Sequence, residues 1–247
     1  IFSNKDVYWS NDKNGIVEID KATFRTTSYV LFPVESMVED ANNIFYGTLH
    51  YNLMRFDKTL RKNVVLARSD SLAFIDIIRH NGALYAATNK GLYIYENDQS
   101  KLLKVNGVND FISIDYVDPY GILLGNRVGV LYQYNIKTRT FTEFYSDDRK
   151  ASIASVLVDS NNNVWINTFA GIVAYNPVTA KKIRFGQVDG FSHFECNRHS
   201  ALKTTDGRFV VGTIKGVNFF HPEKIKKSKT GQVPAIILLA YFSKSLD

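Results

Sequence analysis

Short apolar runs separated by small or polar residues return at regular intervals along the chain. Each copy begins with an apolar, often aromatic run, passes through a small or polar pair to a Gly or Asn, and ends in a second apolar run. Runs of this length, alternating or continuously apolar, are typical of strands with one or two buried faces. The anchors of the six copies are Gly15, Asn52, Gly91, Gly129, Gly171 and Gly216.

The spacing of these anchors predicts the fold. Successive anchors lie 37, 39, 38, 42 and 45 residues apart. A period of roughly 40 residues made of short strands is the sequence signature of a β-propeller, with one four-stranded blade in each repeat. We therefore predict an all-β fold, a β-propeller of four-stranded blades of about 40 residues each. Six visible repeats indicate a six- or seven-bladed ring.

Each repeat divides into four predicted strands joined by polar hairpins. Connectors rich in Asn, Asp and Gly supply the positive φ that tight hairpins need. The first repeat begins at its second strand, so its inner strand is missing or lies in residues 1–5, and the sixth shows no evident outer strand after Pro222. The other inner strands are predicted at 36–40, 74–79, 112–118, 153–159 and 200–204.

The last residues of the chain differ in pattern from the repeats. After Lys229 a turn precedes an apolar run over 233–242, in which Pro234 takes an early position that a strand tolerates. This tail either closes the ring or opens the first strand of a following domain. We adopt the second interpretation, with the propeller at 1–229 and a linker plus the first strand of a following Ig-like domain at 230–247.

Composition agrees with a large β core, and charge adds a clue about the partner. The 247 residues are 45% hydrophobic, with 17 Phe and 14 Tyr against 2 Met, as expected where flat side chains fill the space between sheets. Residues 1–180 hold 18 Lys and Arg against 19 Asp and Glu, whereas residues 181–247 hold 12 against 5. This basic quarter is either a solvated edge or a surface for an anionic sugar, lipid headgroup or nucleic acid.

Sequence motifs for catalysis or metal binding are missing. The chain has no Gly-Lys-Ser/Thr phosphate loop, no His-Glu-x-x-His zinc motif and no Gly-x-Ser-x-Gly nucleophile elbow. Cys196 is the single cysteine, which excludes an internal disulfide. It lies between His193 and His199, but in a loop entering a strand this spacing points the three side chains apart. We expect no catalytic residue, no metal and no cofactor.

The candidate ligand-binding residues lie in the same stretch. Asn197, Arg198 and His199 come where the chain enters a predicted inner strand, on the face around the propeller axis where loops of several blades converge. His193 precedes them and is a further candidate. Arg127, in the connector before an anchor Gly, is the fifth candidate, with an exposed polar turn as its alternative.

The aromatic residues are assigned to packing rather than to ligand contact. Trp165 occupies a slot that other apolar residues fill in the other repeats, so we expect it between blades rather than under a sugar. Interleaved aromatic and basic residues also occur in RNA-binding surfaces, but here the aromatics follow the blade period. No nucleic-acid partner is expected.

The residue pattern of the repeats resembles that of a known family, the two-component regulator propeller repeat. The copy at 163–179 is the most similar to the family pattern. The stretch 189–225 resembles the last blade of such sensors, and 233–236 resembles the start of the small Ig-like domain that follows it. Asn52 and Ala87 replace glycines of the pattern, which weakens the repeat without disturbing its strands.

The resemblance implies a function. Such propellers form the periplasmic sensor of hybrid two-component histidine kinases in glycan-degrading bacteria, ahead of an Ig-like domain, a membrane helix and cytoplasmic kinase and regulator modules. This chain would be a non-catalytic second propeller. Its partners would be an oligosaccharide, the neighbouring propeller and Ig-like domain, and a second copy in a homodimeric receptor. The basic last quarter favours an acidic glycan over a neutral one. A propeller lyase or hydrolase and a protein-interaction scaffold stay open as alternatives.

Overall fold

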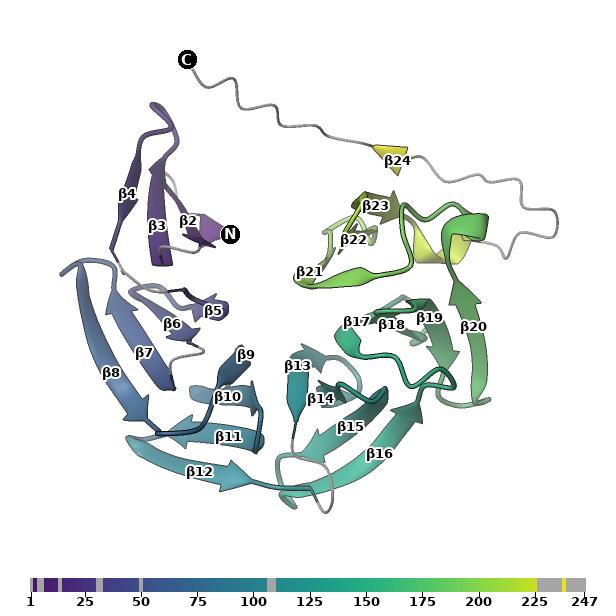
Figure 1. Cartoon of the computed structure of the whole chain (residues 1–247), viewed down its shortest axis with the longest axis horizontal. Helices are drawn as coiled ribbons and strands as arrows, with labels where there is room; N and C mark the ends of the chain where they lie inside the picture. Colours follow the sequence, from purple (N-terminus) through teal and green to yellow (C-terminus); the bar gives the residue numbers. More distant parts are fainter. Residues whose placement is uncertain are drawn as a thin grey trace. The chain divides into compact units, whose positions relative to one another are not determined.

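Every sheet in the described part of the chain is a four-stranded meander (Figure 1). The computed structural model describes residues 2–3, 7–12, 15–29, 33–48, 51–105, 110–225 and 237–238. Over these residues there are six sheets, each made of four consecutive strands that lie side by side in chain order. The predicted fold, an all-β propeller, is confirmed with six blades.

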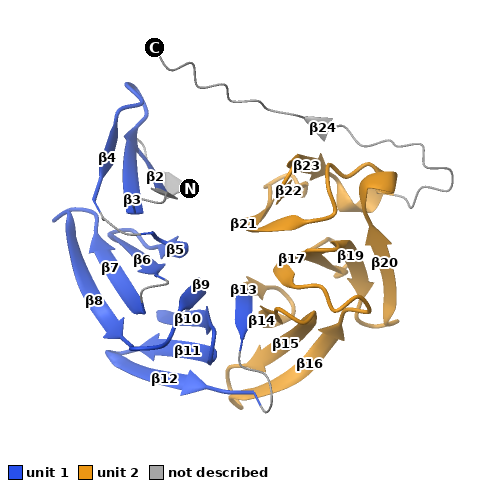
Figure 2. Ribbon diagram, viewed as in Figure 1, with its two compact units in different colours: residues 1–114 blue, residues 115–247 orange. Residues whose placement is uncertain are grey.

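The first compact unit, residues 1–114, contains three blades (Figure 2). The strands of its first blade are β1 (Phe2–Ser3), β2 (Val7–Asp12), β3 (Gly15–Asp20) and β4 (Thr26–Ser28). Those of the second blade are β5 (Ser36–Glu39), β6 (Asn43–Gly47), β7 (Asn52–Asp57) and β8 (Lys62–Arg68). Those of the third blade are β9 (Phe74–His80), β10 (Ala83–Thr88), β11 (Gly91–Glu96) and β12 (Gln99–Leu103).

The second unit, residues 115–247, contains the other three blades, although β13 begins just before it. The fourth blade consists of β13 (Phe111–Val117), β14 (Gly121–Asn126), β15 (Val130–Asn135) and β16 (Thr140–Ser146). The fifth consists of β17 (Ile153–Val158), β18 (Val164–Thr168), β19 (Gly171–Asn176) and β20 (Lys181–Phe185). The sixth consists of β21 (Cys196–Lys203), β22 (Phe209–Thr213), β23 (Gly216–Phe220) and β24 (Ile237–Leu238), with short 3-10 turns at Gln187–Asp189 and Pro222–Lys224.

Four of the outer hairpins share the same pair of side-chain-to-backbone hydrogen bonds. The third strand ends in an Asp or Asn whose Oδ1 accepts hydrogen bonds from the backbone N–H groups two and three residues later. These residues are Asp20, Asp57, Asn135 and Asn176. Four positions further on, the chain takes a positive φ in each case. An Asx turn followed by a left-handed residue therefore returns the chain into the outer strand.

The hairpin between the second and third strands depends on the anchor glycine. In the fifth blade the Thr168 hydroxyl donates to the carbonyl oxygen of Gly171 at 2.6 Å. Gly171 has φ +110°, and a Cβ there would lie 2.6 Å from the carbonyl oxygen of Phe185. Only glycine fits such a backbone and such a close approach, which explains why Gly recurs in the sequence pattern.

The core of the second unit lies between its successive blades. The Trp165 ring is 4% exposed and stacks on Phe185, with ring centroids 5.5 Å apart. It also contacts Phe209 and Phe220 of the sixth blade. Its indole N–H donates to Asp159 at 2.9 Å. The prediction that Trp165 packs between blades is confirmed.

The two ends of the chain supply strands to the first and sixth blades. β1 pairs with β2 and lies within the 1–5 range predicted for the missing inner strand. β24 pairs with β23 as an outer strand of the sixth blade and lies within the apolar run 233–242, for which the sequence left ring closure as an alternative. The other residues beyond 225 lie outside the described residues, so the Ig-like domain start at 230–247 stays a prediction.

Candidate functional site

Hydrogen bonds join the connectors at one end of the three blades of the second unit. We call the connectors 126–130, 147–152, 168–171, 186–196 and 213–216, together with residues 197–200 at the start of β21, the loop face. The Ser152 hydroxyl donates to the carbonyl oxygen of Arg127 at 2.9 Å, and its own carbonyl accepts from Phe169 N at 3.0 Å. The backbone N of Gly171 donates to Phe194 at 2.7 Å, and that of Ile214 donates to Glu195 at 3.2 Å. Connectors of three blades thus form one continuous surface.

A buried carboxylate holds the connector 147–152 in place. Asp147 is 3% exposed and accepts hydrogen bonds from Tyr145 Oη at 2.9 Å, from Ala151 N at 3.0 Å and from the Arg184 guanidinium. Burial works against its charged form, but these hydrogen bonds outweigh burial and hold the pKa of Asp147 below its ordinary value. Arg184 also donates to Ala170 O at 3.0 Å, so this guanidinium is part of the frame.

The basic run 181–184 is partly committed to neighbouring groups. Besides Arg184, Lys182 pairs with Asp148 at 3.0 Å and lies over the Tyr145 ring. A second basic run of this quarter, at 224–229, falls mostly beyond residue 225, outside the described residues. Two cations of the basic quarter, Lys182 and Arg184, are thus paired with carboxylates of the connector 147–152, so anion binding on the loop face would depend on other cations.

The candidate residues Asn197, Arg198 and His199 lie in a bulge of β21. The strand pairs Cys196 with Thr213 and then Ala201 with Val211, so the residues between lie outside the regular ladder. His199 takes φ +54° there. Bulges re-aim side chains, and left-handed non-glycine residues concentrate at functional sites. The bulge also makes β21 start four residues before the predicted inner strand.

The bulge brings two of the five predicted residues into one pocket. Asn197 and His199 are exposed and line a cavity of about 340 Å³. The rest of its lining comes from the three strands of the sixth blade that meet there: residues 200–202 of β21, Val210, Gly212 and Thr213 of β22, and the first two residues of β23, Gly216 and Val217. Arg198 is half-buried and does not line this cavity. An amide and an imidazole side by side are suited to hydrogen-bonding hydroxyl groups.

His193 and Arg127 have different surroundings from these residues. His193 is 7% exposed, its Nδ1 accepts the backbone N–H of Glu195 at 3.0 Å, and its ring lies 4.1 Å from that of Phe194. A buried ring that is hydrogen-bonded to the backbone of its own connector stabilises the conformation of the connector 186–196. Arg127 is exposed on its connector and lines neither cavity of the loop face. Whether either residue touches a ligand stays a prediction.

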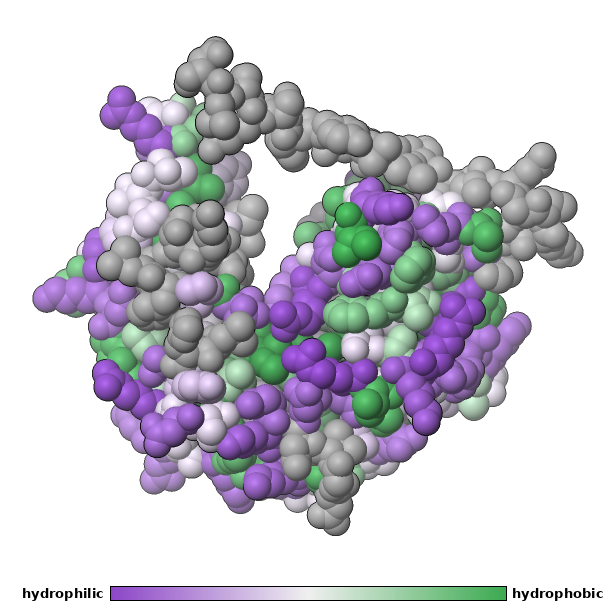
Figure 3. All heavy atoms as spheres, viewed as in Figure 1, coloured by the Kyte–Doolittle hydropathy of each residue, from purple (hydrophilic) through white to green (hydrophobic). Residues whose placement is uncertain are grey.

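A second hollow of the loop face was not found from the sequence. This cavity of about 540 Å³ is lined by Arg149, Ala170, Arg184, Phe194 and residues 185–189. Its Phe194 is 46% exposed. On the face seen in Figure 3, hydrophobic side chains are interspersed with hydrophilic ones, and Phe194 adds an aromatic surface beside a guanidinium. In the sequence, the available signal was a Phe at position 194, in a connector between predicted strands.

The single thiol is an unreactive core group. Cys196 is 1% exposed, and burial raises the pKa of its thiol to about 12, so it stays protonated at neutral pH. Within the ranges that the structure describes, no three His, Cys, Asp or Glu side chains gather as a metal site. In the same ranges no helix has the length and apolarity to cross a membrane.

Comparisons with known proteins found similarity in sequence over part of the chain and similarity in fold over most of it. No family model matches the chain. Over 94 residues, 38% of this chain, it is 33% identical to Histidine kinase P4 of Formosa agariphila. The extracellular domain of a hybrid two-component system from B. thetaiotaomicron is similar over 89% of this chain, with a TM-score of 0.75 and 18% identity. A second such domain from the same organism covers 89% with a TM-score of 0.51 and 14% identity.

These matches cover only part of the larger proteins. The chain spans 7% of the length of the histidine kinase, and 31% and 37% of the two solved domains. At such low identities the solved structures show the fold alone. The resemblance expected from the repeats is confirmed: the chain is similar in fold to extracellular domains of hybrid two-component systems and, over part of its length, in sequence to a histidine kinase.

Proposed function

We propose that this chain is the periplasmic sensing domain of a hybrid two-component signalling protein, and that it binds an acidic oligosaccharide on the loop face without turning it over. The observation that carries the proposal is the segment 186–200. It places Asn197 and His199 in one cavity and Phe194 in the next. Two hollows that share one segment suit a ligand longer than a single sugar ring.

The chemistry of the two hollows supports this class of ligand. Hydroxyl groups both donate and accept hydrogen bonds, which Asn197 and His199 can match. The exposed Phe194 ring suits the C–H face of a sugar, and the Arg149 guanidinium suits a carboxylate or sulfate through paired N–H donors. Arg184 in the same hollow is already bonded to Asp147, so Arg149 is the cation offered to an anionic group.

Signalling requires only that the ligand prefer one arrangement of the receptor. The segment 186–200 is tied to the fifth blade through Gly171 and to the turn 213–216 through Ile214. A ligand that fixes this segment would shift the populations of a homodimeric receptor, with the neighbouring propeller and Ig-like domain transmitting the change to a cytoplasmic histidine kinase.

The test is a binding series with two loop-face variants and a charge-matched control. An acidic oligosaccharide such as oligogalacturonate should raise the melting temperature of the protein more than a neutral one of equal length. Phe194→Ala and Arg149→Ala should each weaken binding at least about tenfold, a loss of about 1.4 kcal/mol. Lys137→Ala, which removes an exposed cation from an outer hairpin of the same unit, should bind normally.

Two results would overturn the proposal. Shortened sugars in the mixture, detected by mass spectrometry, would indicate a lyase or hydrolase. Binding that is unaffected by both loop-face variants would place the ligand elsewhere.

A further inference from the structure

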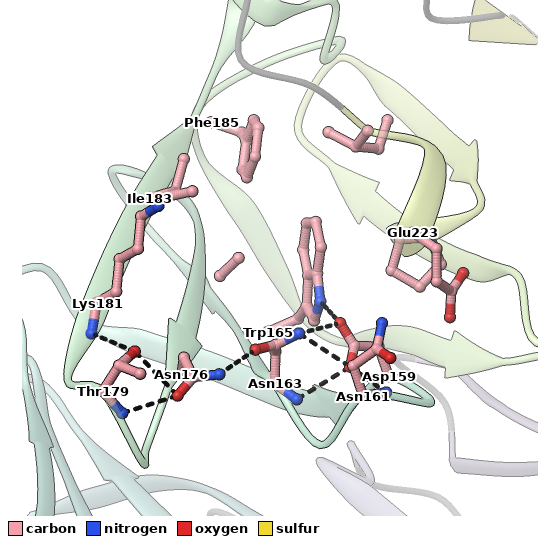
Figure 4. A pocket seen from close by; sticks show the side chains of 13 residues that line it. Asp159, Asn161, Asn163, Trp165, Asn176, Thr179, Lys181, Ile183, Phe185 and Glu223 are labelled. Carbon is pink, nitrogen blue, oxygen red and sulfur yellow. Dashed lines mark hydrogen bonds between the residues drawn. The ribbon is translucent and has the colours of Figure 1, made fainter.

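The other end of the fifth blade carries a separate pocket (Figure 4). It lies between the fifth blade and the 3-10 turn Pro222–Lys224 of the sixth, both in the second unit, and has a volume of about 310 Å³. Its floor is apolar, with Ile183, Phe185 and Ile225. Its rim carries Asn161, Lys181 and Glu223. Of the residues that line it, only Phe185 also lines a hollow of the loop face.

The equivalent position between the fourth and fifth blades is filled. There Tyr120, from the connector after β13, lies 5.1 Å from the Phe144 ring, which lies 5.9 Å from that of Tyr175. The Tyr120 hydroxyl also donates to the carbonyl oxygen of Asn162 at 2.7 Å. Three aromatic rings thus close this junction, in keeping with the close packing of protein interiors.

The junction between the fifth and sixth blades has polar residues where the aromatic plug would be. The connector after β17 carries Ser160 and Asn161 at the place of Tyr120. Ser160 Oγ donates to the Glu223 carboxylate at 2.7 Å and links the two blades at the rim. The chain therefore joins these blades by a hydrogen bond and leaves a cavity beneath it.

A hydrogen-bonded chain of side chains fixes one wall of the pocket, as Figure 4 shows. Asn176 Nδ2 donates to Asn163 Oδ1 at 2.9 Å, and Asn163 Nδ2 donates to Asp159 Oδ2 at 3.0 Å. Asp159 also accepts the indole N–H of Trp165 at 2.9 Å. Because each side chain holds the next, the wall is ordered before any ligand arrives, which lowers the entropy cost of binding.

We propose that this pocket binds a single neutral sugar ring, at a site separate from the loop face. The rim offers the amide of Asn161, the ammonium donors of Lys181 and a carboxylate acceptor on Glu223, which together match hydroxyls that both donate and accept. The apolar floor matches the C–H face of a sugar. One cation against two carboxylates, Asp159 included, leaves a formal excess of negative charge that disfavours an acidic ring.

The test uses an indole resonance as a local reporter. The chain has two tryptophans, and Trp165 lines the pocket whereas Trp9 lies in the first unit. We expect at least one of glucose, galactose, mannose and rhamnose, at up to about 10 mM, to shift the Trp165 indole N–H signal in a ¹H–¹⁵N spectrum. The Trp9 signal should not move, and glucuronate should have a weaker effect than the neutral sugars.

A plug variant separates this site from binding elsewhere. Asn161→Tyr, which introduces the residue type of Tyr120, should abolish the shift, whereas Thr205→Tyr in the corresponding hairpin of the sixth blade should preserve it. No shift with any neutral sugar, or a shift that survives in Asn161→Tyr, would overturn the proposal. A larger shift with an Ala-Leu dipeptide would overturn it in favour of a peptide site. The two proposals can be tested independently. Phe194→Ala changes the loop face and leaves this pocket intact, so a negative result for binding on the loop face would not alter the Trp165 signal measured here.

Discussion

The side chain of Asp115 on β13 accepts a hydrogen bond from the backbone N of Val156 on β17, at 2.9 Å. The first unit repeats the arrangement, because Asp76 on β9 accepts from the backbone N of Ile114 on β13 at 3.0 Å. In both cases a carboxylate on one inner strand satisfies an N–H on the next. A charged acceptor makes such a bond stronger than a neutral one, so a single side chain links two neighbouring blades.

We predict that Asp115→Ala lowers the free energy of unfolding by about 1–3 kcal/mol, since Val156, which is 1% exposed, loses an acceptor where water has little access. Urea unfolding monitored by fluorescence measures the change. Asp70→Ala removes an exposed carboxylate and should stay within about 0.5 kcal/mol of the parent protein. Equal effects of the two substitutions would show that the Asp115 bond adds nothing to stability.

Gly171→Ala should be strongly destabilising, by about 2 kcal/mol or more, because φ is +110° and the new Cβ would lie 2.6 Å from the carbonyl oxygen of Phe185. Gly186 is the matched control. Its backbone is extended and a Cβ there meets nothing within 4 Å, so Gly186→Ala should change the unfolding midpoint little. A mild effect at Gly171 would mean that the hairpin can relax, and that the recurrence of Gly has another cause.

Acid should destabilise the protein partly through Asp147. Its pKa is lowered in the folded state, so its contribution to stability is present above the unfolded-state value of about 4 and is lost as pH falls further. Asp147→Asn should reduce the free energy of unfolding at pH 7 by roughly 3 kcal/mol, because the Arg184 guanidinium loses its buried partner. The variant should also lose less stability than the parent protein between pH 5 and 3.

The neighbouring Asp148 provides the control for this experiment. Its side chain is 78% exposed and pairs with Lys182 at 3.0 Å. Exposed pairs contribute little, so Asp148→Asn should preserve both the stability at pH 7 and its acid dependence. If the two substitutions gave the same pH profile, the buried position of Asp147 would not be the cause of its effect.

Local signals explain why most of the fold could be predicted. The anchor glycines, the Asp or Asn that ends a third strand, and the apolar runs act through neighbours in sequence, and they located most strands to within a residue or two. The bulge in β21 escaped prediction because its four residues include no glycine and its cause lies in pairing with β22. A strand was predicted in the run 233–242 that contains β24, but its pairing with β23 was not, because β23 ends well before that run along the chain.

The candidate site was predictable only where its residues are contiguous. Asn197 and His199 could be named together because one segment carries both into one cavity. Arg149 and Phe194 come together only through the packing of two blades, and no local pattern announces that. The burial of His193, which is 7% exposed, likewise depends on packing that no local pattern announces.

The backbone at His199 yields a last prediction. Its φ of +54° is a conformation that glycine adopts freely and alanine does not. His199→Gly and His199→Ala both remove the imidazole, so their difference reports the backbone alone. We expect the Gly variant to be more stable than the Ala variant by about 1 kcal/mol in urea unfolding, while both bind an acidic oligosaccharide more weakly than the parent protein.

Asn197, two residues away in the same bulge, should show the opposite order. It does not have a positive φ, so Asn197→Ala should be at least as stable as Asn197→Gly. The reason is that glycine increases the conformational entropy of the unfolded chain, which folding must then overcome. An Ala variant at 199 as stable as the Gly variant would mean that the bulge is not strained. Backbone strain lowers stability, and proteins retain it where function requires a side chain to point in a particular direction. A His199→Gly variant that is more stable than His199→Ala would therefore support a binding role for the bulge.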